Sequence, residues 1–140
     1  SLGSADTCRQ DYVDAIGDAR AAGAVVVASA GNSAGEPVHA PANCPGVIAV
    51  AGLRHQGTKV GFSSAGPEVA LSAPAGNCVN TGIDEPCLYP ILTTSNSGTT
   101  TPRSSIYTGS FYDASYGTSF AAPLVSGAAA LMLGVQPALT

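Results

Sequence analysis

Gly117-Thr118-Ser119-Phe120-Ala121-Ala122-Pro123-Leu124-Val125-Ser126-Gly127 is the stretch that decides the fold of this chain. Its serine stands between a turn glycine and a run of small apolar residues, and that run predicts a buried helix over residues 118–134. The Ser119 hydroxyl then lies at a helix N-terminus, where backbone N–H groups lack intrahelical acceptors and the dipole is positive. Such a position suits a nucleophile whose reaction creates an oxyanion.

Ser119 also has two other interpretations. A serine ahead of a helix is most often a cap, but the eleven-residue context favours a nucleophile. In that context Pro123 fits a first helical turn and Gly127 permits close packing. The Gly-x-Ser-x-Gly nucleophile elbow of α/β-hydrolases is not matched, because residue 121 is alanine.

The order of elements along the chain indicates an α/β fold. An amphipathic helix is predicted over residues 10–22, and continuous apolar runs at 24–28 and 46–51 are typical of strands buried on both faces of a parallel sheet. Residues 94–103 are polar and indicate a loop. We therefore expect mainly parallel strands flanked by helices, with peripheral β-hairpins. Shorter β-like segments lie at 60–62, 69–72, 88–93 and 105–107.

Composition limits the possible partners. The 140 residues are 45% hydrophobic and only 10% charged, which suggests a piece of something larger whose apolar faces need covering. The formal net charge is −4 and Lys59 is the only lysine, so we expect no nucleic-acid partner. No apolar run approaches the length of a membrane span, so we expect no membrane partner either.

The four cysteines, Cys8, Cys44, Cys78 and Cys87, include no Cys-x-x-Cys pair, which argues against a zinc site. An even count in a chain with so few lysines favours secretion and two disulfides, although buried free thiols are the alternative. Three connectivities are possible. We prefer Cys8–Cys44 and Cys78–Cys87.

A second candidate residue follows the first buried run. Asn32 ends the segment Ser29-Ala30-Gly31-Asn32, at the carboxyl end of a strand, where sites form in open α/β sheets. An asparagine amide can donate to a developing oxyanion. An ordinary Gly-Asn turn is the alternative. A phosphate-binding loop is not indicated, since no Gly-Lys-Ser/Thr follows.

Together, the segments around Ser119 and Asn32 resemble the nucleophile and oxyanion-hole motifs of the subtilisin-like serine proteases. Residues 40–50 and 62–67 also match that family. The resemblance implies that Ser1, Leu2 and Gly3 pair with the substrate backbone and line one wall of the S1 pocket. Ser29, Ala30 and Gly31 would form the opposite wall. His39 would approach the base of the pocket, unless it is an exposed loop histidine; His55 is interpreted as solvated.

The family also requires a histidine base and an aspartate that orients it, which lie ahead of the serine in Asp-x-Gly and His-Gly-Thr-His contexts. Neither context occurs in this sequence. The resemblance therefore covers residues 1–140 as the C-terminal portion of a single catalytic domain. We expect the partner to be the N-terminal portion of that domain. A natural short chain with no activity is the alternative.

The resemblance implies a secreted serine endopeptidase that cleaves protein or peptide substrates through an acyl-enzyme. Leu2 and Ala30 would favour bulky or apolar P1 side chains. No organic cofactor is implied. A structural calcium ion is possible in the parent enzyme, but Arg54 stands where the family often has an aspartate ligand, which leaves the carbonyls near Ala42 and Cys44. The functional alternative is a non-catalytic module that binds peptides or complements another fragment.

Overall fold

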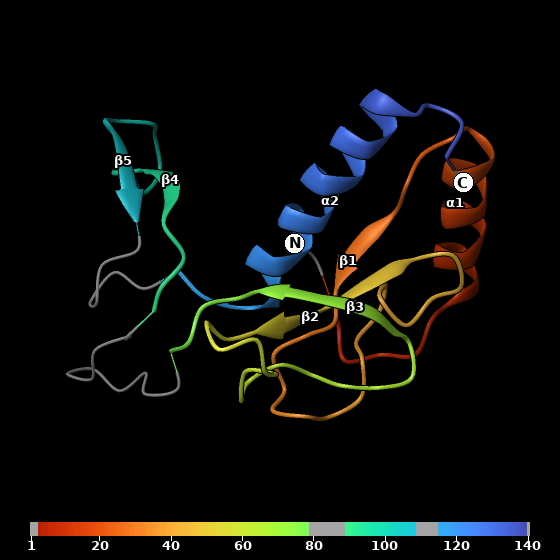
Figure 1. The fold of residues 1–140 in the computed structure, drawn as a ribbon, viewed down its shortest axis with the longest axis horizontal. Helices are drawn as coiled ribbons and strands as arrows, with labels where there is room; N and C mark the ends of the chain where they lie inside the picture. Colours follow the sequence, from red (N-terminus) through yellow and green to blue (C-terminus); the bar gives the residue numbers. More distant parts are fainter. Residues whose placement is uncertain (1–2, 79–88, 109–114, 140) are drawn as a thin grey trace.

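The computed structural model describes residues 3–78, 89–108 and 115–139. Three parallel strands form a sheet in the order β1-β2-β3, and α2 packs against all three (Figure 1). A separate antiparallel hairpin, β4-β5, stands to one side. In chain order the elements are α1 (Gln10–Ala21), β1 (Val27–Ser29), β2 (Ile48–Leu53), β3 (Val69–Pro74), β4 (Thr93–Asn96), β5 (Ser105–Thr108) and α2 (Thr118–Val135). This is the α/β arrangement that the sequence predicts.

The central strand β2 carries the core because it is covered on both faces. Successive side chains of a strand point to opposite faces. Ala49 and Ala51 therefore pack in one cluster of buried residues, while Val50 packs in another with Ala121 and Ala122 of α2. Burial on both sides explains why this segment is continuously apolar rather than alternating. The strand itself begins and ends two residues later than predicted, at 48–53 instead of 46–51.

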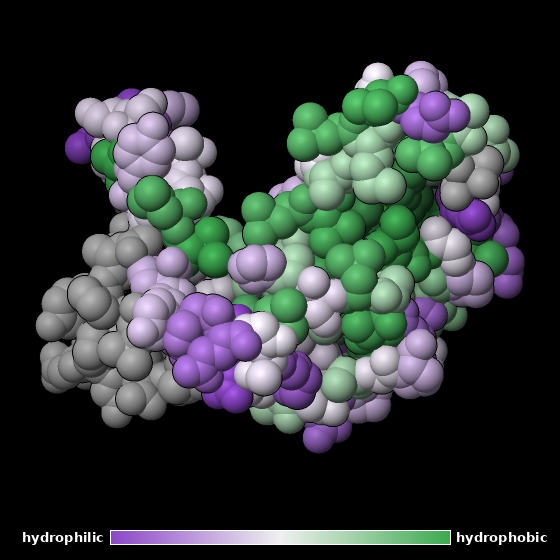
Figure 2. Space-filling view, in the orientation of Figure 1, coloured by the Kyte–Doolittle hydropathy of each residue, from purple (hydrophilic) through white to green (hydrophobic). Residues whose placement is uncertain are grey.

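Helix α2 begins at Thr118 as predicted, but two expectations about it are wrong. Pro123 lies inside the helix rather than in its first turn. The helix is buried only near its start, where it meets the sheet, and its later turns extend past the strands. Leu131 and Val135 are 76% and 86% exposed, respectively. Hydrophobic residues gather over the region that α2 occupies (Figure 2).

The expectation that no apolar run approaches a membrane span also needs correction. By length and composition alone, the 18 residues of α2 are long and apolar enough to cross a membrane. The first turns of this helix nevertheless pack on the sheet, with Ala121 and Ala122 in its core.

Two of the shorter predicted strands are absent or displaced. Residues 61 and 62 form a turn and residue 60 has no regular structure, while the neighbouring Lys59 makes only an isolated bridge to Leu53. The predicted loop at 94–103 contains most of β4, which pairs with β5 from Thr93↔Thr108 to Asn96↔Ser105. This hairpin carries polar residues on an exposed strand, so no alternating apolar pattern marks it in the sequence. Within the predicted segment 88–93, residue 88 lies outside the described residues.

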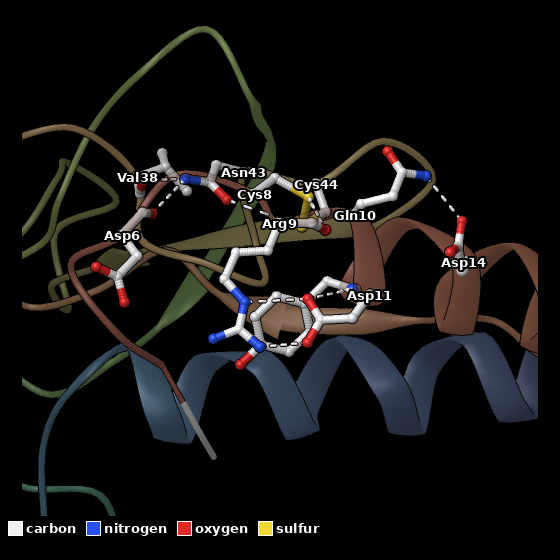
Figure 3. Close-up of a disulfide and its surroundings, with 10 residues drawn as sticks. Asp6, Cys8, Arg9, Gln10, Asp11, Asp14, Val38, Asn43 and Cys44 are labelled. Atoms are coloured by element: carbon white, nitrogen blue, oxygen red, sulfur yellow. Dashed lines mark hydrogen bonds and ion pairs between the residues drawn. A yellow bond between two sulfur atoms is a disulfide. The ribbon is translucent and has the colours of Figure 1, made fainter.

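The Cys8–Cys44 disulfide is present as preferred, and it joins cysteines with a sequence separation of 36 (Figure 3). It ties the segment ahead of α1 to the connection between β1 and β2. Asn43 reinforces the same link, since its Nδ2 donates to the carbonyls of Asp6 at 3.0 Å and Val38 at 3.2 Å. Cys78 is buried, and Cys87, its expected partner, lies outside the described residues.

An exposed ion pair marks the start of α1. The Arg9 guanidinium donates to the Asp11 carboxylate, as Figure 3 shows. This hydrogen bond holds the pKa of Asp11 below its ordinary value and raises that of Arg9. Both side chains are exposed, so solvent screening leaves the pair little effect on stability.

Candidate active site

Ser119 is the second residue of α2, and the turn before it is fixed by backbone hydrogen bonds. The Gly117 N–H donates to the Ala75 carbonyl at 2.8 Å, and the Phe120 N–H donates to the Gly117 carbonyl at 2.9 Å. The first bond anchors the turn to the residue after β3. Ser119 is half-buried there.

Thr118 fixes the orientation of the Asn32 side chain. Its backbone N–H and its Oγ1 both donate to Asn32 Oδ1, each at 2.9 Å. An atom that accepts two hydrogen bonds is the amide oxygen, so Nδ2 is the donor that Asn32 can present elsewhere. Thr118 Oγ1 also accepts from the Gly31 N–H at 3.2 Å, and the threonine is fully buried. One side chain thus connects the helix start to the loop after β1.

Two glycines allow this close approach. Gly117 has φ +127°, and a Cβ there would lie 3.1 Å from Asn32 Nδ2. Gly31 has φ +112°, and a Cβ there would lie 2.8 Å from His39 Nδ1 and 2.9 Å from Ser64 Oγ. Both backbones are in the region that side chains other than glycine rarely adopt. The geometry around Asn32 therefore requires glycine on both sides.

A cavity of about 200 Å³ joins these residues, and we call it the Ser119 pocket. Most of the predicted site residues within the described ranges line it, which brings positions far apart in the sequence to one place. Its described lining residues are Gly3, Ser29, Gly31, Asn32, His39, Thr118 and Ser119.

Ala30 is the predicted wall residue that does not line the Ser119 pocket. It is 0% exposed and packs in the core with Ala28 and Ala49. Ala30 follows the last residue of β1, and its N–H donates to the Val50 carbonyl of β2 at 2.9 Å, which holds it against the core. Ser1 and Leu2 lie outside the described residues. The expectation of an apolar P1 preference therefore gains no support from Ala30.

His39 is held firmly against the loop after β1. Its Nε2 and the Ser33 hydroxyl form a hydrogen bond at 3.1 Å, and its backbone N–H donates to the Ala30 carbonyl at 3.0 Å. Its side chain is half-buried and lines the Ser119 pocket. His55, by contrast, is exposed and stacks on Tyr89 with 3.8 Å between ring centroids. Of the two histidines in the sequence, His39 alone is near Ser119.

Sequence reasoning missed three supporting residues. Thr118 orients Asn32, Ser33 bonds to His39, and Ser64 bonds to the loop after β1 at two points. Ser64 Oγ accepts from the Ser33 N–H at 3.2 Å, and its own N–H donates to the Gly31 carbonyl at 2.9 Å. The match of residues 62–67 to the protease family was a signal for Ser64, but no periodicity indicated which bond it makes.

The described part of the chain supplies a hydroxyl and hydrogen-bond donors, but no carboxylate lines the described wall of the Ser119 pocket. A complete acid–base pair for Ser119 is therefore not assembled by these residues. Nor do three His, Cys, Asp or Glu side chains gather anywhere in the described ranges. A calcium ion in the parent enzyme therefore remains only a possibility. The Arg54 guanidinium instead donates to Thr58 Oγ1.

Comparison with known proteins gives one consistent result. The subtilase family (peptidase S8) matches residues 1–140. An extracellular protease of Xanthomonas campestris pv. campestris is 41% identical over 139 residues, which are 98% of this chain and 21% of that protein. Subtilisin DY of Bacillus licheniformis is 34% identical over 130 residues, which are 90% of this chain and 38% of that protein.

The fold agrees with the sequence match. The solved structure of a protease from Pseudoalteromonas arctica PAMC 21717 superimposes with a TM-score of 0.86 at 36% identity, over 99% of this chain and 39% of that one. The chain thus spans about a fifth to two fifths of the relatives and the structure compared with it.

Proposed function

The chain belongs to the subtilase family, and we propose that it supplies the nucleophile and oxyanion-binding half of a secreted serine endopeptidase. One observation carries the proposal: Asn32, oriented by Thr118, lines the same pocket as Ser119. Relatives named extracellular proteases and the Cys8–Cys44 disulfide support secretion.

In the proposed reaction, Ser119 Oγ attacks the carbonyl carbon of the scissile peptide bond while a base takes its proton. The carbonyl oxygen becomes an oxyanion, to which Asn32 Nδ2 and the Ser119 backbone N–H donate. Collapse of this intermediate expels the amine with a proton and leaves an acyl-enzyme. Water then attacks the ester and regenerates Ser119.

The base is assigned to an N-terminal portion of the same catalytic domain, together with the aspartate that orients it. The fraction of the structural neighbour that this chain covers, 39%, leaves room for such a portion. The apolar face of α2 gives it a surface to cover.

The backbone that pairs with an extended substrate is assigned to residues 1–3. Ser4 and Ala40 exchange two backbone hydrogen bonds. The Ser4 N–H donates to the Ala40 carbonyl at 3.0 Å, and the Ala40 N–H donates to the Ser4 carbonyl at 3.1 Å. This bridge fixes the segment next to Gly3, which lines the Ser119 pocket. An extended peptide would then add alongside residues 1–3 by strand pairing.

One observation favours a second candidate function, a non-catalytic module that binds peptides or complements another fragment. The sequence holds neither the Asp-x-Gly nor the His-Gly-Thr-His context, while its peptide-binding segment is intact.

A peptide phosphonate that labels reactive serines tests the proposal, read by intact mass and peptide mapping. The chain alone should stay unlabelled. Addition of the N-terminal half of a related catalytic domain should give stoichiometric labelling at Ser119, and Ser119→Ala should abolish it. No labelling in the completed domain would support the binding module instead. Labelling of the chain alone that His39→Ala abolishes would identify His39 as the base and contradict the assignment to a partner.

A further inference from the structure

Ser115 lies where the β4-β5 hairpin meets the turn that leads into α2. We propose that Ser115 is a positioning residue for Ser119: it ties both ends of the hairpin to this turn and thereby sets the rate at which Ser119 attacks the substrate. The inference rests on the proposed function. It adds a residue that acts through the nucleophile and does not belong to the described lining of the Ser119 pocket.

The hairpin stands apart from the core. In the described part of the chain, β4 and β5 contact each other and no other helix or strand, and Figure 1 shows them to one side of the sheet. A two-stranded hairpin on its own is only marginally stable in water. The position of this hairpin therefore depends on the residues at its base and on what those residues contact.

Ser115 contacts the base of the hairpin from both strands. The Ile91 N–H, just ahead of β4, donates to the Ser115 carbonyl at 2.7 Å. The hydroxyls of Ser115 and of Thr108, the last residue of β5, form a hydrogen bond at 2.5 Å. Thr93 pairs with Thr108 across the hairpin, so both contacts meet the same end of it. One half-buried serine thus holds the two strands where they join the rest of the molecule.

The residues between Ser115 and the helix are packed closely against the segment after β3. Gly76 has φ +81°, and a Cβ there would lie 3.0 Å from Tyr116 Cβ and 3.1 Å from the Tyr89 carbonyl oxygen. The hairpin base and the turn therefore meet over the same glycine. The Gly117 N–H donates to the Ala75 carbonyl at 2.8 Å, next to this contact. A displacement of the hairpin base displaces residues 115–117, and Ser119 follows directly on them.

Such a displacement should affect the reaction more than substrate binding. The segments assigned to the substrate, residues 1–3 and 29–31, lie elsewhere in the chain. Attack requires that Ser119 Oγ be aligned with the carbonyl carbon, and a small misplacement of reacting groups is costly in rate. Loss of the Ser115 hydroxyl should therefore lower kcat and leave KM nearly unchanged.

The test uses the completed domain and measures kcat and KM for a peptide substrate together with the rate of phosphonate labelling at Ser119. Ser115→Ala and Thr108→Val each remove the bond between the two hydroxyls. Each should lower kcat and the labelling rate by about tenfold, while KM changes by less than about twofold. The double variant should be no slower than either single variant, because both substitutions remove the same bond. Ser115→Thr keeps the hydroxyl and should restore most of the rate.

Ser97→Ala is the matched control. Ser97 Oγ accepts from the Ser104 N–H at 3.2 Å at the opposite end of the hairpin, so this variant removes one hydroxyl hydrogen bond away from the base. It should leave kcat and KM unchanged. An equal loss in Ser97→Ala would show that any damage to the hairpin slows the enzyme, and would overturn the role assigned to Ser115.

Unchanged kcat in both Ser115→Ala and Thr108→Val would also overturn the inference, as would a change confined to KM or additive losses in the double variant. Labelling of the wild-type completed domain separates the two possible failures. A labelled wild type whose variants react equally fast refutes this inference alone, whereas an unlabelled wild type refutes the proposed function.

Discussion

Thr118 is the residue on which the arrangement of the site depends most. It precedes the candidate nucleophile, and its side chain and backbone both donate to Asn32 while its hydroxyl accepts from Gly31. A motif search finds the serine and the asparagine, but it does not show that this threonine holds them together.

Thr118→Val tests this role, because valine keeps the shape and removes the hydroxyl. The Gly31 N–H would lose its acceptor and Asn32 one of its two donors, so the free energy of unfolding should fall by about 1–3 kcal/mol. Denaturant titration measures that change. The rate of Ser119 labelling in the completed domain should fall as well. Thr118→Ser, which keeps the hydroxyl, should behave like the wild type; equal losses in both variants would contradict the assignment.

Gly117→Ala should disturb the same pair from the helix side. The new Cβ would lie 3.1 Å from Asn32 Nδ2 on a backbone at φ +127°, so both strain and crowding oppose it. We expect a loss of about 1–3 kcal/mol of stability and a marked loss of labelling. Gly127→Ala in the same helix, where nothing lies within 4 Å of the new atom, is the control and should be neutral or slightly stabilising.

At the residue scale, the sequence predicts the candidate reactive residues better than it predicts the residues whose hydrogen bonds hold them in place. Ser119 and Asn32 stand in local patterns, so their positions beside a helix and a strand could be read directly. The bond from the Ser33 N–H to Ser64 depends on the packing of two segments that are 31 positions apart in the sequence. The bond between Ser33 and His39 depends on how the irregular loop after β1 folds back on itself. No local pattern encodes such pairs.

At the scale of elements, burial decides what could be predicted. Strand β2 is buried on both faces and α1 has an amphipathic pattern, so both were located from apolar spacing alone. The β4 strand is exposed and polar, and its turn is closed by Asn96 Oδ1, which accepts from the N–H groups of Gly98 and Arg103. Periodicity gives no signal for a hairpin that rests on hydrogen bonds instead of core packing.

The disulfide should stabilise the connection between α1 and the β1–β2 loop. With a sequence separation of 36, chain-entropy arguments give about 3–4 kcal/mol for Cys8–Cys44. The double variant Cys8→Ser/Cys44→Ser should lower the free energy of unfolding by about 3–4 kcal/mol, as measured by denaturant titration. Wild type in a reducing agent is the companion measurement. Unchanged stability in both would show that Asn43 and the Ser4–Ala40 bridge suffice to hold this region.

The exposed turns of α2 can be tested separately from its buried start. Leu131→Glu/Val135→Lys places charges on side chains that are already exposed, so stability should change by no more than about 0.5 kcal/mol. Complementation by the N-terminal half should nevertheless be lost, as measured by Ser119 labelling. Ala121→Glu, which puts the same kind of charge into the core, should instead unfold the chain. Intact complementation in the double variant would show that another face receives the partner.

For the whole molecule, the sequence is rich in hydrophobic residues and poor in charged ones, and part of this apolar surface remains exposed in the structure. Apolar side chains gather on the face that carries α2 (Figure 2), and β1 is an edge of the sheet in the described structure. Patches of this kind mark interaction surfaces.

The isolated chain should therefore self-associate. Light scattering should give a mass that rises with concentration, and addition of the N-terminal half should convert the mixture to a one-to-one complex. The Leu131→Glu/Val135→Lys variant should associate less, since its patch is interrupted. A compact monomer at every concentration would refute the hypothesis that the apolar face of α2 is an interaction surface.

The link from Thr118 to Asn32 also has a consequence for timing. The two residues are 86 positions apart, so Asn32 gains its orientation only after the ribosome has released the start of α2 and that helix has docked. Until then the Asn32 amide is not oriented as an oxyanion donor, and on the proposed function a nascent chain cannot yet cleave peptide bonds.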